Sequence, residues 1–224
     1  MTLRVATFNI HHGRGLDERI DLERTASVLK RTGARFIAMQ EVDRGMARSG
    51  KVDQPGTLSE LLGMPVHFFA TLRRGSGEYG LAVASSDPIE PEFHAFERLA
   101  DEEPRGFVTA RWNGVTVIAT HMSLQRAPNR AHMRALAEAL RTVPGPVVVM
   151  GDMNAPRTEL APLVATGLEP SPRCHRTLNR PWRRRQIDHV LAGRGARVLT
   201  SETIRSDASD HLALAADLET LVAY

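Results

Sequence analysis

Asp152 and Asn154 are the residues of this sequence whose types and spacing most directly suggest chemistry. They follow an apolar run, Val147 to Met150, which predicts a strand buried on both faces. Gly151 then allows the backbone to turn sharply, and Pro156 prevents the strand from continuing. A carboxylate and a carboxamide two residues apart can point at one place just beyond a strand end, where open α/β sheets usually bind ligands. The alternative is a turn in which Asp152 only caps the strand.

Other polar residues of ligand type recur at the ends of predicted strands or in the adjoining turns. They are Asn9, Glu41, His121, Asp210 and His211, and Asp188 lies inside a predicted strand. Taken singly, the first three have simple explanations: a turn residue, a solvated charge and a partly buried histidine with a hydrogen-bond partner. Chance would scatter such residues over exposed faces, so their joint position indicates a single site.

Carboxylate, amide and imidazole groups in this pattern suit the hydrolysis of phosphoesters. Oxygen ligands favour Mg²⁺ or Mn²⁺, and Mg²⁺ usually takes only one or two protein carboxylates while it keeps several waters. A histidine beside an aspartate can carry a positive charge against a phosphate oxygen or transfer a proton. A nucleotide-binding loop does not compete, because Gly13-x-Gly15 is too short and lacks the Lys-Ser/Thr pair,.

The hydrophobic periodicity predicts many strands with a few helices between them. We expect helices at residues 21–31, 58–62, 128–141 and 159–164, the first of them capped by Asp21 and stopped by Gly33,. Residues 170–185, rich in proline and arginine, predict a loop, and Asn113-Gly114 is the strongest hairpin signal,. The expected strands cover residues 3–9, 34–39, 66–70, 79–84, 93–96, 107–112, 115–120, 147–150, 186–191, 198–204 and 212–218.

The composition predicts one globular domain over residues 1–224, with 42% hydrophobic residues, a net charge of +3 and a pI of about 9.6,. Lys30 and Lys51 are the only lysines, so arginine supplies most of the basic charge and mildly favours anionic partners. Cys174 is the only cysteine, which excludes an internal disulfide and a cysteine-based zinc site. No apolar run reaches membrane-spanning length and no signal-peptide core is present, so we expect a cytoplasmic protein, monomeric by default.

Seven short motifs follow one another through the chain: Thr7-Phe8-Asn9-Ile10, Gln40-Glu41-Val42, Tyr79-Gly80-Leu81-Ala82, Thr120-His121, Gly151-Asp152-Met153-Asn154, Ile187-Asp188-His189 and Ser209-Asp210-His211. In this order they resemble the endonuclease/exonuclease/phosphatase superfamily over nearly the whole chain. Single motifs such as Gln-Glu are weak, but the ordered set is highly specific. The resemblance implies a DNase I-like four-layer α/β sandwich. Its two packed mixed β-sheets are flanked by helices, and its site lies where the strand ends of both sheets meet.

The resemblance implies a role for each matching residue. Glu41 would be the principal ligand of Mg²⁺ or Mn²⁺, with Asn9 beside it and Asp210 assisting at or near the metal. Asp152 would orient or deprotonate the attacking water, and Asn154 would hold the phosphate or that water. Water would attack in line, without a covalent enzyme intermediate.

The two histidines also have counterparts in the family. His211 would bind a phosphate oxygen or act as acid/base, held by Asp188. His121 matches the second histidine of the deoxyribonuclease and sphingomyelinase branches, and Glu78 is a looser match for a residue that orients it. Tyr79 stands where some members place a phosphate-binding tyrosine, although packing within its strand is an equal alternative.

Loop residues near these motifs are candidates for substrate binding. His12 and Arg44 border the predicted site, although His12 could also be only a loop residue. Arg184 belongs to the run Arg183-Arg184-Arg185 beside Trp182. This run could contact phosphates and stack a base, or it could be a solvated loop with a packed tryptophan.

These observations predict a Mg²⁺- or Mn²⁺-dependent phosphodiesterase whose partner is a phosphodiester substrate. Nucleic acid is one candidate substrate, which would make the protein a nuclease. Two alternatives stay open. One is a phosphatase or a lipid or small-molecule phosphodiesterase of the same fold, and the other is a non-catalytic binding module. The presence of Glu41, Asp152, Asn154, Asp188 and His211 argues against the last.

Overall fold

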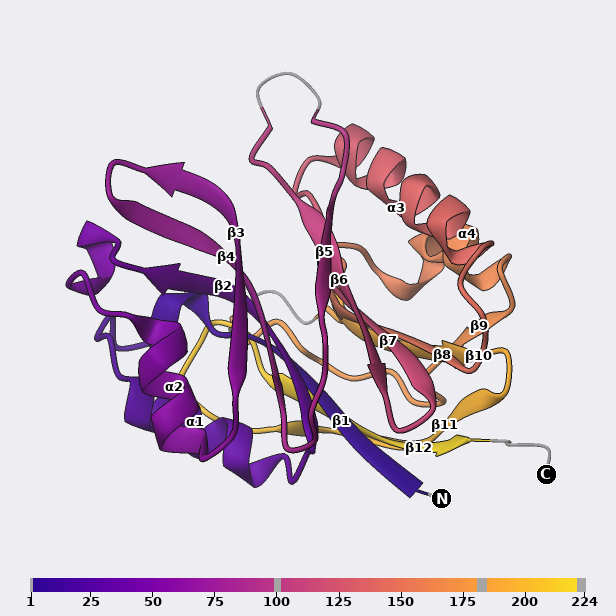
Figure 1. Cartoon of the computed structure of the whole chain (residues 1–224), viewed down its shortest axis with the longest axis horizontal. Coiled ribbons are helices and arrows are strands. Elements are labelled where there is room, and N and C mark those ends of the chain that lie inside the picture. Colours follow the sequence, from indigo (N-terminus) through magenta and orange to yellow (C-terminus); the bar gives the residue numbers. More distant parts are fainter. Residues whose placement is uncertain (1, 99–101, 181–184, 221–224) are drawn as a thin grey trace.

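Two six-stranded β-sheets form the centre of the molecule (Figure 1). The computed structural model describes residues 2–98, 102–180 and 185–220, and the elements named below lie within them. The first sheet has the strand order β11-β12-β1-β2-β4-β3. Its strands are β1 (Thr2–Asn9), β2 (Phe36–Arg44), β3 (Val66–Arg74), β4 (Gly77–Ser85), β11 (Ala196–Ile204) and β12 (Ala213–Thr220).

The second sheet has the order β5-β6-β7-β8-β10-β9. Its strands are β5 (Glu92–Ala95), β6 (Gly106–Trp112), β7 (Val115–His121), β8 (Val147–Asp152), β9 (Leu168–Pro170) and β10 (Asp188–Gly193). Among the described strands, each sheet contains one parallel pair, β1 with β2 and β7 with β8. Because the carboxyl ends of parallel strands meet at one edge of a sheet, the ends of β7 and β8 lie side by side. A hydrogen bond from Asn9, at the end of β1, to Asp152, at the end of β8, connects them to the first sheet.

Helices cover the outer face of each sheet (Figure 1). Helices α1 (Leu22–Arg31) and α2 (Gln54–Leu62) pack on the first sheet, whereas α3 (Arg126–Leu140) and α4 (Ala161–Val164) pack on the second. Asp21 begins α1 as predicted, because its side chain accepts a hydrogen bond from the backbone N–H of Arg24,. Short 3₁₀ segments lie at His11–Gly13, Ala47–Ser49 and Arg157–Glu159.

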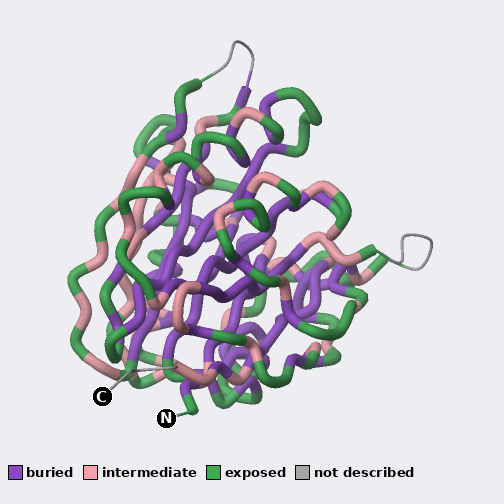
Figure 2. Tube along the Cα trace, turned by 90° about the vertical axis from the view of Figure 1, so that its right-hand side faces the viewer, coloured by how far each residue is buried: buried purple, intermediate pink, exposed green. Residues whose placement is uncertain are grey.

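Apolar side chains fill the space between the two sheets. Phe36 and Leu81 of the first sheet belong to the same buried cluster as Val117, Met150 and Val190 of the second. Figure 2 shows the buried strands at the centre of the molecule and the exposed segments at its periphery. Helix, sheet, sheet and helix thus form four layers, and the predicted α/β sandwich with two packed mixed sheets is confirmed.

Most predicted elements are present, with small changes at their ends. Asn113 and Gly114 have positive φ values of 47° and 81°, as a two-residue hairpin turn between β6 and β7 requires. The sequence pattern does not predict β9, since three residues are too few to show a periodicity. β2 continues through Arg44 instead of ending at Met39. No described helix is long and apolar enough to cross a membrane.

Candidate active site

Three of the predicted site residues form a row across the second sheet. His121 on β7 pairs with Asp152 on β8, and Asp152 pairs with Asp188 on β10. Residues opposite each other on adjacent strands place their side chains on the same face of the sheet. All three are buried, and they face the first sheet, because Asn9 of β1 reaches Asp152. The register of three strands therefore assembles this half of the site.

The close approach of β7 and β8 beside this row requires a glycine. Gly151 has a φ of +149°, and a Cβ built on it would lie 2.0 Å from the backbone carbonyl oxygen of Thr120. A larger residue would push the strands apart next to His121 and Asp152. Gly151 thus serves close packing within β8, and the sharp turn predicted at this glycine is wrong because the strand continues through Asp152.

Asn9 joins the two sheets at the site. Its Nδ2 donates to Oε1 of Glu41 at 2.9 Å and to Oδ2 of Asp152 at 3.0 Å. Its Oδ1 accepts the backbone N–H of His11 at 3.0 Å. Asn9 is almost fully buried, so these bonds fix both carboxylates in position. In this arrangement the amide nitrogen of Asn9, which is a donor, faces the two carboxylates.

Glu41 occupies an irregular point of β2. The pairing of β2 with β4 shifts between Met39 and Val42, and Glu41 has a φ of +59°. A non-glycine residue in this conformation costs on the order of 1–3 kcal/mol and is typical of functional sites. The bulge turns the Glu41 carboxylate toward Asn9 and the cleft.

Asp152 lies between two imidazole rings. Its Oδ2 is 3.6 Å from Nε2 of His121 and 3.8 Å from Nε2 of His211, while its Oδ1 accepts the backbone N–H of Asn154 at 2.9 Å. Burial, together with the charge of Asp188, raises the pKa of Asp152 to about 7, although the charge of His211 acts in the opposite direction. A carboxyl group with a pKa near neutrality can accept and release a proton at working pH.

His211 and Asp188 form a buried pair. Nδ1 of His211 lies 2.9 Å from Oδ2 of Asp188. Burial alone would lower the pKa of His211, but the carboxylates of Asp188 and Asp152 outweigh it and raise the pKa to about 10. The backbone N–H of His211 donates to Oγ of Ser209 at 3.1 Å. His211 is therefore a fixed cation at neutral pH, and the predicted association with Asp188 is present.

His121 has a different partner from the one suggested by the sequence. Nη1 of Arg105 lies 2.6 Å from Nδ1 of His121, and both residues are buried. Burial, followed by the charges of Arg105 and His211, lowers the pKa of His121. The suggestion that Glu78 orients His121 is wrong, because the Glu78 carboxylate accepts a hydrogen bond from Nε of Arg44 at 2.6 Å.

Arg105 is a site residue that the sequence reasoning missed, although a signal existed. The Asn113-Gly114 turn fixes the register of the β6–β7 hairpin, and that register pairs Gly106 with His121. Counting back from the turn places Arg105 directly beside this pair. Nη1 of Arg105 also lies 3.5 Å from the hydroxyl group of Tyr79.

Two residues of the 170–185 loop hold the turn that carries His211. Oγ1 of Thr177 accepts the backbone N–H of Asp188 at 3.1 Å, and the backbone carbonyl of Thr177 accepts the N–H of Leu212 at 2.7 Å. Nδ2 of Asn179 donates to the backbone carbonyl of Ser209 at 3.1 Å. The sequence offered no signal for these supporting bonds, because they join residues between 11 and 35 positions apart that belong to no common motif.

The site opens into a cleft of about 480 Å³. The cleft contains most of the predicted catalytic and metal-binding residues, together with loop residues from the second half of the chain. Asn9 and Asp188 lie behind this lining, where they hold Asp152 and His211. The lining residues are His11, Glu41, His121, Leu124, Asp152, Asn154, Leu178, Arg180, Arg185, Ile187, Asp210 and His211.

Three of the predicted substrate-binding residues, Tyr79, Arg44 and His12, are not among the described residues that line the cleft. Tyr79 is 5% exposed and packs in β4. Arg44 pairs with Glu78 and lies over the ring of Phe68. His12 is buried beside His11, and burial, with the charge of Arg48, lowers its pKa to about 4.

The basic loop contributes other arginines to the cleft. Arg184 lies outside the described residues, as do Trp182 and Arg183, whereas Arg180 and Arg185 line the cleft. Nη2 of Arg180 donates to Oδ2 of Asp210 at 2.6 Å. Oδ1 of Asp210 lies 3.6 Å from Nδ1 of His11. Asp210 thus stands at the mouth of the site with one oxygen paired.

Comparisons with known proteins bear on the family and the fold of this chain. The model of the endonuclease/exonuclease/phosphatase family matches residues 6–211, which include every motif identified in the sequence. A search of curated proteins finds no match.

Several solved structures share the fold at low sequence identity. An endonuclease/exonuclease/phosphatase from Beutenbergia cavernae is 22% identical with a TM-score of 0.81, covering 98% of this chain and 72% of that chain. TDP2 from D. rerio, complexed with a single-strand DNA product, is 15% identical with a TM-score of 0.73, covering 98% and 99% of the two chains. A mannosyl-6-phosphatase from Bacteroides thetaiotaomicron is 16% identical with a TM-score of 0.71, covering 97% and 99%. The family match over nearly the whole chain, on this fold and with this site, shows that the chain belongs to the endonuclease/exonuclease/phosphatase family.

Proposed function

We propose that this protein is a divalent-metal-dependent phosphodiesterase that activates a water molecule for in-line attack on phosphorus. The observation that carries the proposal is the position of Asp152. Its Oδ2 lies within 3.8 Å of Nε2 of both His121 and His211, at the floor of an open cleft. A proton acceptor between two phosphate-binding donors suits the hydrolysis of a phosphoester.

Glu41 would hold the metal, with Asp210 assisting. The donor set fits Mg²⁺ or Mn²⁺, because the carboxylates of both residues line the cleft and oxygen ligands suit these ions,. When bound, the ion would neutralise charge that develops on the phosphate oxygens. Asn9 would act by holding Glu41 and Asp152, since its amide donates to both.

The remaining side chains divide the chemistry between them. Asp152, with a pKa raised to about 7, would accept the proton of the attacking water. His211 would remain protonated beside Asp188 and stabilise a phosphate oxygen by its charge. His121 would be neutral and would present an Nε2–H, because its Nδ1 accepts from Arg105,. Asn154, whose Nδ2 donates to the carbonyl of Met122, would direct its side-chain oxygen, which is an acceptor, toward the attacking water.

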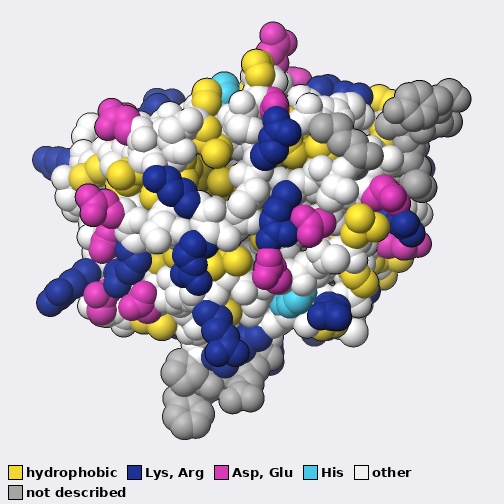
Figure 3. Space-filling model, turned by 90° about the horizontal axis from the view of Figure 1, so that it is seen from below, with side chains coloured by type: hydrophobic (Ala, Val, Ile, Leu, Met, Phe, Trp, Pro, Cys, Tyr) yellow, Lys and Arg dark blue, Asp and Glu magenta, His cyan; other side chains and the backbone are white. Residues whose placement is uncertain are grey.

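We further propose that the substrate is small or single-stranded. In the described part of the cleft, Arg180 and Arg185 are the arginines present, and Arg180 is already paired with Asp210. Basic and acidic side chains are interspersed on the face shown in Figure 3. A long duplex would require many phosphate contacts, and two arginines, one of them already paired, supply few of them.

The test compares a generic phosphodiester, bis(p-nitrophenyl) phosphate, with a generic phosphomonoester, p-nitrophenyl phosphate. Wild-type protein is expected to hydrolyse the diester with Mn²⁺ or Mg²⁺ and to lose activity with a chelator. Asp152→Asn should lose at least about 100-fold in kcat, whereas Asp217→Asn on β12, whose carboxylate pairs with Arg4 outside the cleft lining, should retain activity. Preferential hydrolysis of the monoester would instead assign a phosphatase, and no hydrolysis of either would favour the non-catalytic alternative.

A further inference from the structure

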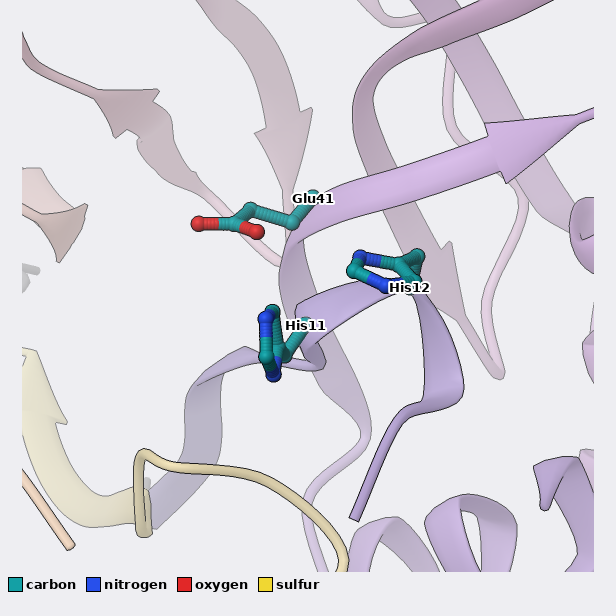
Figure 4. Close-up of side chains that lie close together, drawn as sticks. All are labelled: His11, His12 and Glu41. Atoms are coloured by element: carbon teal, nitrogen blue, oxygen red, sulfur yellow. The ribbon is translucent and has the colours of Figure 1, made fainter. Parts of the chain in front are cut away.

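Three side chains beside the cleft form a cluster that the proposed chemistry uses only in part. His11, His12 and Glu41 each offer one ligand atom, and these atoms lie within 4.8 Å of one another. Figure 4 shows the side chains converging from two segments, with His11 and His12 just after β1 and Glu41 on β2. An ion held at about 2.1 Å by each ligand needs them no more than about 4.2 Å apart. Small side-chain rotations would therefore close the cluster around an ion.

His12 supplies independent evidence for a ligand. The residue is 6% exposed, and within the described residues its buried Nδ1 has no hydrogen-bond partner. A buried polar atom without a partner costs about 1–3 kcal/mol. Nε2 of Gln54 donates to the backbone carbonyl of His12 at 2.7 Å, which holds the backbone of this residue in place. A cation bound through this nitrogen would give it the partner that the described residues do not provide.

His11 connects the buried histidine to the cleft. The two imidazole rings meet edge to face, with centroids 4.6 Å apart. His11 lines the cleft, and its Nδ1 is 3.6 Å from Oδ1 of Asp210, which is too long for a hydrogen bond. His11 therefore lies between buried His12 and the cleft that it lines together with Glu41.

We propose that a divalent transition-metal ion binds among His11, His12 and Glu41. This inference rests on the proposed function, because Glu41 is the metal ligand in that function and also in this cluster. It deepens the proposed function by naming the class of metal. Imidazole nitrogens with a carboxylate suit Mn²⁺, Fe²⁺ or Zn²⁺, whereas Mg²⁺ is bound mainly through oxygen. The ion held by Glu41 is then a transition metal with nitrogen ligands.

Mn²⁺ is the probe for the test, since its pulsed electron paramagnetic resonance spectrum reports directly bonded nitrogen. Chelator-treated full-length protein is loaded with Mn²⁺, and its affinities for Mn²⁺ and Mg²⁺ are measured by calorimetry. Wild type is expected to show nitrogen couplings and to bind Mn²⁺ at least about 10-fold more tightly than Mg²⁺. The double variant His11→Asn/His12→Asn should lose the couplings and about 10-fold or more in Mn²⁺ affinity, with Mg²⁺ affinity little changed.

His67→Asn on β3 is the matched control, because it removes an imidazole elsewhere in the first sheet. Metal-free melting temperatures identify variants that fail to fold, and His11→Asn, at the partly exposed residue, carries the test if His12→Asn is unstable. Mn²⁺ binding that Glu41→Gln abolishes but that shows no nitrogen couplings would overturn this inference and leave the proposed function intact. Absence of Mn²⁺ binding, or binding unchanged in Glu41→Gln, would overturn both.

Discussion

Arg105 donates a hydrogen bond to Nδ1 of His121 at 2.6 Å, where a carboxylate would ordinarily be expected beside a histidine of a hydrolytic site. A guanidinium group cannot accept a proton, so Nδ1 of His121 must be the acceptor and the ring proton must lie on Nε2. The opposite arrangement exists at His211, where Asp188 holds a charged ring. The two histidines that flank Asp152 thus differ in charge because their buried partners differ in sign.

Arg105→Met should remove the positive charge that keeps the ring proton of His121 on Nε2. We expect kcat/KM to fall roughly 10- to 100-fold, as is typical when a supporting partner is removed, and the pKa of His121 to rise. Nitrogen NMR of the histidine rings, with His121→Asn to assign the signal, would show whether the Nε2–H form is lost. Glu103→Gln is the control, because Glu103 pairs with Arg105 at 3.3 Å without contacting His121. An unchanged ring signal in Arg105→Met would contradict the assigned tautomer.

Stability of the metal-free protein should fall as the pH rises from about 6.5 to about 10. The pKa of His211 is raised to about 10 in the folded state but returns to about 6.5 on unfolding. Between these two pH values the folded state binds more protons than the unfolded state. The contribution of His211 to the free energy of unfolding is therefore complete below the lower pKa and is lost as the pH rises through the upper one. Urea unfolding in a chelator should reveal a loss of up to a few kcal/mol.

Asp188→Asn should flatten this pH dependence, because the main carboxylate that holds the proton on His211 is removed. Asp217→Asn is the control, since its carboxyl pairs with Arg4 and its pKa is lowered, so it titrates only at acidic pH. A slope that survives unchanged in Asp188→Asn would assign the effect to another group.

Glu41→Gln should abolish metal-induced thermal stabilisation and most activity while the metal-free fold survives. The amide keeps the shape of the side chain but loses the charge that attracts a cation. Calorimetry with Mn²⁺ checks the affinity. Glu78→Gln offers a matched glutamate, because Glu78 pairs with Arg44 and Arg73 away from the cleft lining. Equal metal affinity in the two variants would remove Glu41 from the ligand set.

The dependence of activity on salt should be shallow. Each DNA phosphate neutralised contributes a slope of roughly −0.9 for duplex DNA, and the described cleft offers few free cations. We expect kcat/KM for a short single strand to be at least comparable to that for a long duplex. Arg185→Gln should weaken both about equally, and Arg111→Gln on β6, outside the cleft lining, should change neither. A steep slope confined to duplex DNA would make the basic loop a duplex-binding element.

Much of the fold follows from short-range patterns. The apolar run before Asp152 and the Asn113-Gly114 turn are local signals, and each yields the predicted strand or hairpin. The ordered motifs also identify the residues that the structure brings into contact, such as His211 with Asp188.

Long-range side-chain bonds explain what the sequence could not provide. The bulge that turns Glu41 depends on pairing with β4, and the partner of His121 comes from a segment with no motif of its own. Arg44 borders the predicted site in the chain, yet its ion pair with Glu78 draws it away. The ordered motifs therefore predicted most of the residues that meet in the cleft, whereas position in the chain beside a motif did not predict which other residues line it.

The hydrogen bond between Asn9 and Asp152 crosses from one sheet to the other, so each sheet supplies half of a working centre. A slide of about 1 Å between the layers would leave every strand intact while misplacing the proton acceptor, and such an error can cost on the order of 100-fold in rate. The apolar side chains packed between the two sheets therefore keep Asn9 and Glu41 in position relative to Asp152. We consequently expect activity to fall on warming at a lower temperature than the one at which the strands unfold, because activity depends on the position of one sheet relative to the other.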